Sequence, residues 1–368
     1  MSTIAYFISD HGFGHASRSI AIIRSLLDCD LEISIEIHTS KPLSFIQRSF
    51  PRNKKAQRVA FHEQMNDFGF IGDKRTGNID YQRTATEVSS WIKNWHTSYL
   101  FDTYRYCKAK NIDLIISDIA PQPFLLAKKL DLPSIAISNF TWLDIYQNSA
   151  FDLGDLDILW KAYREASFGL LLPFNLENAV FCSAMETNLV SRPPTRTKQQ
   201  MRELLSLDPD EQVIYLATGF SLRNPFLQEW TDKSDSQFIL GGQHEITHPN
   251  IKAVPFSDPE GQDYIGCSDV VIIKLGYSSV SEAIRSNIPI LGIDFPQTAE
   301  TKQMKKVVEE LGIGLCITSE EFFQGKWLEK ISEVVELEQN FSHLPDRFVK
   351  HGESQIAGII LDLLDEIC

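Results

Sequence analysis

Short apolar runs alternate with amphipathic segments in both halves of the chain, and this alternation is the feature that most restricts its fold. Strands buried inside a parallel sheet appear as short apolar runs, and the helices that cover such a sheet are amphipathic. In the first half we expect strands at 3–9, 31–38, 113–117 and 134–138, and helices at 17–27 and 81–110. This half is therefore predicted to form an α/β domain around a parallel sheet.

A polar segment that contains Pro193 and Pro194 interrupts the alternation before a second series begins. In this series we expect strands at 212–219, 237–242, 251–255, 270–274 and 288–293, and helices at 279–287, 300–311 and 319–337. The 368 residues also exceed what one hydrophobic core usually organises. We therefore expect an N-terminal domain over 1–180, a linker over 181–205 and a C-terminal domain over 206–345.

Composition and charge exclude several classes of protein. Forty-nine acidic residues against 35 basic ones give a net charge of −14, which repels a phosphate backbone, so no nucleic acid is expected as a partner. No apolar run approaches the roughly 20 residues that span a bilayer, so we expect no transmembrane segment, although peripheral membrane contact stays open. The six cysteines are widely spaced and the N-terminus has no basic leader, which favours reduced thiols and a cytoplasmic location.

The loop after the first expected strand carries two glycines and a histidine. Gly12 and Gly14 allow the backbone to approach a ligand closely, and a helix beginning near His15 would direct free N–H groups at that ligand. A neutral imidazole here can take a proton from a nucleophile, with Arg18 one turn further on. The alternative is a simple turn in which His15 caps the helix. His11 and His15 have the spacing of metal ligands on a helix, but the glycines between them disfavour a helix, so we expect no metal.

Two more loops in this half carry polar side chains after expected strands. Asp118 ends one strand and precedes Pro121. It can either orient a histidine from the first loop or cap the helix that begins near Pro121. The next loop contains Asn139 and Trp142, which could line an acceptor pocket; alternatively, Trp142 belongs to the core.

The loop after the strand at 270–274 leads directly into an expected helix. A diphosphate could lie on the backbone of residues 276–279, and Glu282 would face it from the first helical turn and accept two ribose hydroxyls. Ser279 and Glu282 also match a capping box, which needs no ligand. The donor-side candidates are Lys274, Gly276, Tyr277, Ser278, Ser279 and Glu282, together with Gly219 at the end of the 212–219 strand.

Three segments together resemble glycosyltransferases of the GT-B fold. These segments are DHGFGHASR at 10–18, SNFTW at 138–142 and KLGYSSVSEA at 274–283. They are most similar to the glycosyltransferase-like N-terminal region of plant L-arabinokinase. More distantly, they resemble the peptidoglycan N-acetylglucosaminyltransferase and plant UDP-sugar glycosyltransferases. The resemblance covers nearly the whole chain and implies two Rossmann-like parallel-sheet domains that face each other across a cleft.

The resemblance also implies roles for individual residues. His15 would be the base and Asp118 its acidic partner, and Glu282 would hold the ribose of the nucleotide. Glu300 would read sugar hydroxyls, although the sequence around it departs from the pattern of the plant enzymes. Contacts to the base would come from Phe256 and Ser257. A C-terminal helix within 346–368 would pack back on the N-terminal domain.

The reaction implied by the resemblance is transfer of a sugar from a UDP-linked donor to an acceptor hydroxyl with inversion at the anomeric carbon. Helix N–H groups, assisted by Arg18 or Lys274, would stabilise the leaving diphosphate, so neither a metal nor another cofactor is expected. The nucleotide-sugar is a co-substrate, and the acceptor is unidentified. Two rival functions are a nucleotide-sugar hydrolase and a nucleotide-sugar-binding protein without turnover.

Overall fold

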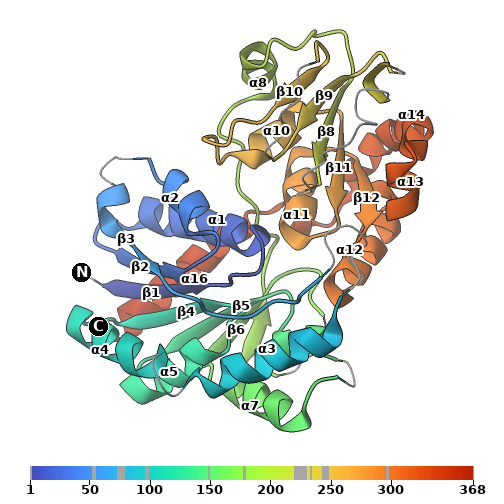
Figure 1. Ribbon diagram of the computed structural model, residues 1–368. Helices are drawn as coiled ribbons and strands as arrows, with labels where there is room; N and C mark the ends of the chain where they lie inside the picture. Colours follow the sequence, from blue (N-terminus) through green and yellow to red (C-terminus); the bar gives the residue numbers. More distant parts are fainter. Residues whose placement is uncertain are drawn as a thin grey trace. The chain divides into compact units, whose positions relative to one another are not determined.

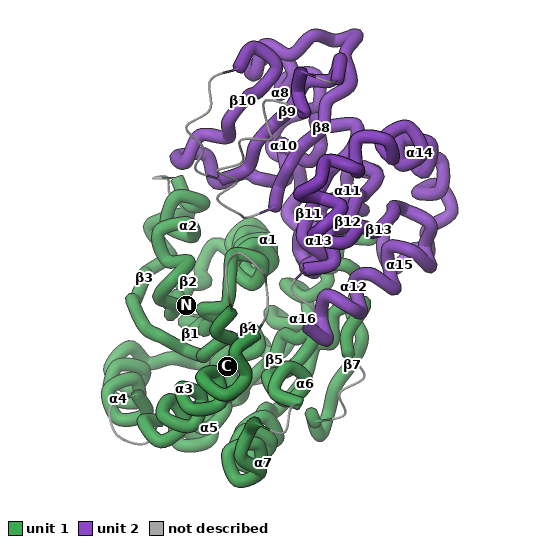
Figure 2. The backbone as a smooth tube through the Cα atoms, turned by 45° about the vertical axis from the view of Figure 1, so that its right-hand side comes forward, with its two compact units in different colours: residues 1–190, 350–368 green, residues 191–349 purple. Residues whose placement is uncertain are grey.

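The computed structural model describes residues 2–51, 55–72, 79–95, 99–147, 150–176, 180–218, 230–232, 234–242, 248–295 and 298–367 (Figure 1). The chain forms two compact units, drawn in different colours in Figure 2. Unit 1 comprises residues 1–190 together with 350–368, and unit 2 comprises residues 191–349. The chain therefore passes from one unit to the other inside the segment expected to be a linker, and its end returns to unit 1.

Unit 1 is built on a seven-stranded parallel sheet with the strand order β3-β2-β1-β4-β5-β6-β7. The strands are β1 (Thr3–Ile8), β2 (Ser34–Thr39), β3 (Val59–Glu63), β4 (Leu114–Asp118), β5 (Ser134–Ser138), β6 (Phe168–Leu171) and β7 (Ala184–Glu186). The three strands β1, β4 and β5 lie inside the sheet and are almost wholly buried, which explains their apolar sequences.

Helices cover both faces of this sheet (Figure 1). One face carries α1 (Gly14–Cys29), α2 (Leu43–Arg48) and α16 (Gly352–Ile367). The other carries α3 (Tyr81–Lys93), α4 (Leu100–Lys110), α5 (Gln122–Leu130), α6 (Trp142–Ile145) and α7 (Leu153–Arg164). Helices α3 and α4 occupy most of the expected 81–110 helix, and residues 96–98 between them lie outside the described part of the chain.

The C-terminal helix α16 packs on α1, although more than 300 residues separate them in the sequence. Its residues Ile356, Ala357, Ile360 and Leu364 are buried and repeat at helical spacing, so they form one apolar face. The helix at the end of the chain therefore contributes to the core of unit 1.

Unit 2 has a six-stranded parallel sheet with the order β10-β9-β8-β11-β12-β13. Its strands are β8 (Val213–Ala217), β9 (Gln237–Leu240), β10 (Ile251–Ala253), β11 (Val270–Lys274), β12 (Ile290–Asp294) and β13 (Gly314–Thr318). Its α-helices are α8 (Lys198–Leu204), α10 (Gly261–Cys267), α11 (Tyr277–Ser286), α12 (Ala299–Glu310), α13 (Ser319–Phe323), α14 (Ile331–Val335) and α15 (Asp346–Val349). The 3₁₀ helices η3 (Lys326–Lys330) and η4 (Glu336–His343) flank α14.

One expectation about the elements is wrong, and four strands were not predicted. The single helix expected at 319–337 is divided, because Gly325 adopts a φ of 73° between α13 and η3 and turns the chain. A side chain at Gly325 would also collide with the indole of Trp230. Strands β3, β6, β7 and β13 were not expected, because strands at or near the edge of a sheet are only partly buried and lack a continuous apolar run.

Both sheets have the doubly wound order, in which the chain moves outward from a central strand first in one direction and then in the other. The reversal lies between β1 and β4 in unit 1 and between β8 and β11 in unit 2. Ligands of such sheets bind beyond the carboxyl ends of the strands at these two points. Within the described residues, no helix combines the length and apolar character needed to cross a bilayer.

Candidate functional site

The reversal point of unit 1 brings together the loop after β1 and the end of β4. Gly12 has a φ of 75°, a conformation that a residue with a side chain rarely adopts, and this turn leads into α1 at Gly14. His15 is the second residue of α1 and is almost completely buried. The loop therefore presents His15 where the sheet reverses.

The Asp118 carboxylate is held by three side chains of α1. Arg18 donates from Nε to Oδ2 at 2.7 Å and from Nη2 to Oδ1 at 2.6 Å. His15 Nδ1 lies 2.9 Å from Oδ1, and Ser19 Oγ donates to Oδ2 at 3.1 Å. No side-chain hydrogen bond caps α5, so the interpretation of Asp118 as a helix cap is wrong.

Asp118 is ionised despite its complete burial. Burial alone would raise the pKa of this carboxyl, but the Arg18 guanidinium, together with His15, lowers it to about 2. An ionised carboxylate can only accept, so we assign the imidazole hydrogen to Nδ1 of His15. Arg18 Nη2 also lies 2.8 Å from this Nδ1, but Nη2 donates to Asp118 Oδ1 at 2.6 Å, so we assign the short N···N distance to two donors that share one carboxylate oxygen. The assignment leaves a lone pair on Nε2, as a general base requires.

Asn139 holds the Arg18 guanidinium in place beside Asp118. Arg18 donates from Nη1 to Asn139 Oδ1 at 2.5 Å, and both side chains are buried. The described contacts of Arg18 therefore position the Asp118 carboxylate, whereas we had expected its guanidinium to face a diphosphate. Asn139, expected to line an acceptor pocket, supports the same guanidinium.

Trp142 belongs to the core, which was the second of its two expected roles. Its side chain is completely buried, packs beside Phe140 and Tyr146, and donates from Nε1 to Asp67 Oδ2 at 3.0 Å. Asp67 also accepts from the backbone N–H of Asp10, and burial, with the nearby Asp10 charge, raises its pKa to about 6. Sequence reasoning missed Asp67, because it lies in an irregular segment after β3 that has no periodic pattern.

In unit 2, the reversal point places the end of β11 and the start of α11 together. Gly276 precedes α11, and a side chain added there would meet nothing within 4 Å. Tyr277 and Ser278 are buried in the first turn, and Ser279 is half-buried. Glu300, in the first turn of α12, accepts from the Tyr277 backbone N–H at 3.2 Å. Its carboxylate therefore already occupies part of the helix end that we expected to hold a diphosphate.

Glu282 lies in the second turn of α11 and forms a buried ion pair. Arg192 donates from Nε to Glu282 Oε1 at 2.8 Å, and Glu282 is only 5% exposed. Helix α11 begins at Tyr277 with no side-chain cap, so the capping-box interpretation of Ser279 and Glu282 is wrong. The expectation that Glu282 belongs to the first turn is wrong for the same reason.

Arg192 also connects Glu282 to the segment expected to contact a base. Its Nη1 donates to the carbonyl of Pro259 at 2.7 Å. Phe256 and Ser257 lie just before Pro259, after β10, and the Phe256 side chain is 64% exposed. The described donor-side residues thus follow the carboxyl ends of β10, β11 and β12, whereas Gly219 lies outside the described residues.

Lys274 ends β11 with a half-buried side chain. Burial lowers the pKa of its amine to about 8, and its Nζ lies 5.4 Å from the centre of the Phe295 ring. A diphosphate next to this amine would favour the protonated form. Lys274 can therefore supply a positive charge at the end of β11, and that charge varies with pH near neutrality.

Comparison with known proteins gives a consistent picture. The sequence profile of glycosyl transferase family 1 matches residues 2–327. L-arabinokinase of Arabidopsis thaliana is 22% identical over 346 residues, which are 90% of this chain and 32% of that protein. An Aquifex aeolicus transferase, named UDP-N-acetylglucosamine--N-acetylmuramyl-(pentapeptide) pyrophosphoryl-undecaprenol N-acetylglucosamine transferase, is 26% identical over 204 residues, which are 50% of this chain and 59% of that protein.

A solved structure supports the architecture. The glycosyltransferase SsfS6 of Streptomyces sp. SF2575, crystallised with thymidine diphosphate, matches with a TM-score of 0.64 and 12% identity, over 98% of this chain and 100% of that one. At such low identity the match establishes the fold, which is the GT-B arrangement of two parallel-sheet α/β domains. The chain spans only a third to three fifths of the two curated relatives described above.

Proposed function

We propose that this chain, which belongs to glycosyl transferase family 1, transfers a sugar from a nucleotide-sugar to an acceptor hydroxyl with inversion. The observation that carries the proposal is the buried group of His15, Asp118 and Arg18 at the reversal point of unit 1. This group provides an oriented imidazole whose Nε2 can accept a proton. Unit 1 would bind the acceptor and unit 2 the donor.

In the proposed mechanism, His15 Nε2 takes the proton from the acceptor hydroxyl as the oxygen attacks the anomeric carbon. Asp118 stays ionised and stabilises the imidazolium that forms. The attack comes from the side opposite the leaving diphosphate, so the configuration at the anomeric carbon inverts. Arg18 keeps Asp118 charged and fixed and does not touch the substrate.

On the donor side, Glu282 would accept the ribose hydroxyls, and Lys274 with the backbone at the start of α11 would stabilise the diphosphate. Glu300 would turn from the Tyr277 N–H to the hydroxyls of the sugar. Lys274 and the backbone N–H groups provide the positive charge without a metal, so we propose that the reaction is independent of metal. The Aquifex transferase is named for UDP-N-acetylglucosamine and SsfS6 binds thymidine diphosphate, which supports a nucleoside-diphosphate donor, UDP-linked in our proposal.

The test is incubation with UDP- and TDP-linked sugars in excess chelator, with and without a mixture of hydroxyl acceptors, followed by identification of the products. We expect a new glycoside of inverted configuration. His15→Ala should lower kcat about a hundredfold to ten-thousandfold with little change in nucleotide affinity. The control is His343→Ala, because His343 is exposed and lies in unit 2.

Other outcomes would contradict the proposal in distinct ways. Release of free sugar irrespective of the acceptors would identify a hydrolase. Tight binding of a nucleotide without consumption of any donor would identify a binding protein. Loss of activity in chelator, with recovery on adding magnesium or manganese, would contradict independence of metal.

A further inference from the structure

Arg192 is a buried arginine in an irregular segment of unit 2. Residues 191–197 form neither helix nor strand, yet the Arg192 side chain is only 3% exposed. Burial of a guanidinium is unfavourable unless acceptors bind its hydrogens. Two of these acceptors are the Glu282 carboxylate on α11 and the carbonyl of Pro259, which lies between β10 and α10. Arg192 therefore connects two segments that follow different strands of the sheet.

The guanidinium holds these two segments through different nitrogen atoms. Nε donates to Glu282 Oε1 at 2.8 Å, and Nη1 donates to the Pro259 carbonyl at 2.7 Å. The third nitrogen, Nη2, lies beside the start of α10, because a side chain added at Gly261 would come within 3.4 Å of it. A guanidinium is planar and rigid, so the two hydrogen bonds fix the carboxylate relative to the backbone at Pro259.

Arg192 binds one oxygen of the Glu282 carboxylate, and no described residue donates a hydrogen bond to the other oxygen, Oε2. A carboxylate can only accept, and each hydroxyl of a ribose can donate. The segment held through Pro259 begins with Phe256 and Ser257, which we expected to contact a base. One guanidinium therefore fixes both the carboxylate suited to a ribose and the segment suited to a base.

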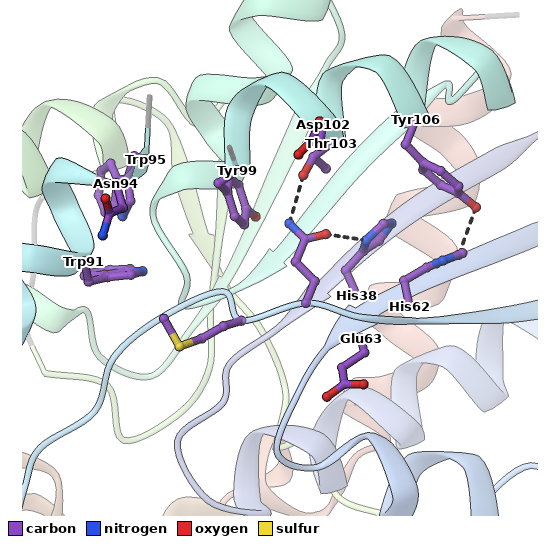
Figure 3. A pocket seen from close by; sticks show the side chains of 12 residues that line it. His38, His62, Glu63, Trp91, Asn94, Trp95, Tyr99, Asp102, Thr103 and Tyr106 are labelled. Carbon is purple, nitrogen blue, oxygen red and sulfur yellow. Dashed lines mark hydrogen bonds between the residues drawn. The ribbon is translucent and has the colours of Figure 1, made fainter. Parts of the chain in front are cut away.

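A cavity of about 530 Å³ in unit 1 is poorly suited to a nucleotide (Figure 3). It lies between the ends of β2 and β3 and the helices α3 and α4. The residues that line it include Glu63 and Asp102 but no lysine or arginine. A diphosphate there would meet carboxylates without a cation to offset them. This contrast favours unit 2 as the place where a nucleotide binds.

We propose that Arg192 makes the donor site selective for ribonucleotides over 2′-deoxyribonucleotides. Arg192 is a positioning residue: it holds Glu282 so that the carboxylate accepts from both hydroxyls of a ribose, and it holds the segment before Pro259 in place for the base. A 2′-deoxyribose offers one hydroxyl fewer and leaves part of a buried carboxylate unpaired, which weakens binding. The inference rests on the proposed function in one respect, namely that Glu282 meets the ribose of the donor.

The test compares the affinities of UDP and 2′-deoxyuridine diphosphate for the whole chain by calorimetry, without an acceptor. The wild-type chain should bind UDP about ten- to hundredfold more tightly, because a hydrogen bond to a charged group is lost with the 2′-hydroxyl. Arg192→Gln should reduce this preference to about threefold or less, because the carboxylate is no longer held in one orientation. Arg192→Lys keeps the charge but not the planar geometry, so its preference should be intermediate.

The ratio of the two affinities separates positioning from a purely structural role. A loss of folded protein weakens the apparent binding of both nucleotides equally and leaves their ratio unchanged. Arg347→Gln, at an exposed position on α15 of unit 2, is the control and should keep the wild-type ratio. A second measurement needs no variant: in isotope-labelled wild-type protein, UDP should shift the Nε–H resonance of Arg192 more than 2′-deoxyuridine diphosphate does.

Several results would overturn the inference. Equal affinity of the wild-type chain for the two nucleotides, or an unchanged ratio in folded Arg192→Gln, would do so and leave the proposed sugar transfer intact. Absence of UDP binding would contradict the donor site of the proposed function as well. A ratio that changes in Asp102→Asn but not in Arg192→Gln would place the nucleotide in the cavity of unit 1. If neither Arg192 variant folds, the wild-type resonance decides, and equal shifts by the two nucleotides would reject the role of Arg192.

Discussion

Arg18 makes a two-point contact with Asp118, through Nε at 2.7 Å from Oδ2 and Nη2 at 2.6 Å from Oδ1. A buried carboxyl without a cation would be protonated more readily. With Arg18 beside it, the carboxylate remains charged above about pH 2 and can orient His15 over the physiological range. The charge of Asp118 thus depends on Arg18, one turn after His15 on the same helix.

Replacing Arg18 should therefore reduce both stability and turnover. Arg18→Gln leaves a buried carboxylate without its cation, which costs about 3–5 kcal/mol of unfolding free energy. Arg18→Lys keeps the charge but not the two-point geometry, so its loss should be intermediate. Urea unfolding and steady-state kinetics provide the measurements, with kcat falling more than the donor KM rises. Arg83→Gln, at an exposed position on α3, is the control, and wild-type behaviour of Arg18→Gln would contradict the role.

His15 and Asp118 should act as one unit in turnover. Asp118→Asn should lower kcat in the same direction as His15→Ala, because the amide no longer stabilises an imidazolium. Partners in one proton-transfer device are strongly non-additive, so the double variant should be little slower than His15→Ala alone. The measurement is kcat for all four proteins under donor saturation. If the reductions in kcat of the two single variants multiplied in the double variant, Asp118 would not act together with His15.

Glu282 should be required for nucleotide binding. Because its variants also disturb the ion pair with the buried Arg192, their loss of stability must be separated from their loss of affinity. Glu282→Ala leaves Arg192 without its carboxylate and should destabilise the chain by about 3–5 kcal/mol. Glu282→Gln keeps an acceptor for Arg192 Nε and should destabilise it less. In calorimetry of folded protein with UDP, both variants should lose roughly 1.5–3 kcal/mol of binding free energy, whereas Glu333→Gln, exposed on α14, should lose none. Unchanged affinity would leave Glu282 a purely structural partner of Arg192.

Nucleotide affinity should fall as the pH rises through about 8. The pKa of Lys274 is lowered to about 8, so its amine is charged below this pH and neutral above it, and only the charged form attracts a diphosphate. Titration of UDP binding from pH 6.5 to 9.5 checks this. Lys274→Met should bind UDP more weakly below pH 8 and should lose this fall in affinity with pH. Lys326→Met, at an exposed position on η3, should retain the pH dependence. The same pH profile in Lys274→Met would show that another group is responsible.

The packing of α16 on α1 predicts that unit 1 is stabilised by the end of the chain. Ile360 is completely buried, so Ile360→Ala should reduce the free energy of unfolding by about 2–5 kcal/mol. Asp365→Ala, at an exposed position of the same helix, should change it by less than about 0.5 kcal/mol. Chemical denaturation followed by circular dichroism measures both. If Ile360→Ala were as stable as the wild-type chain, α16 would contribute little to the core.

The interior strands and the loops that follow them could be predicted from the sequence, because their signals are local. A buried parallel strand needs a short apolar run, and β1, β4, β5 and β11 have one. The glycines before His15 and the glycine before α11 mark strand-to-helix turns for the same local reason. His15, Asp118 and Glu282 could therefore be selected as candidates before their partners were known.

Only the tertiary structure decided the partners of these residues. Asp118 could cap a helix or orient a histidine, and the parallel pairing of β4 with β1 brings it to Arg18, 100 residues earlier in the chain. Glu282 matched a capping box, but the fold brings Arg192 to it from 90 residues away. A local pattern determines which residues face a core or follow a strand, whereas strand order determines which distant side chains meet, and burial then determines their charge.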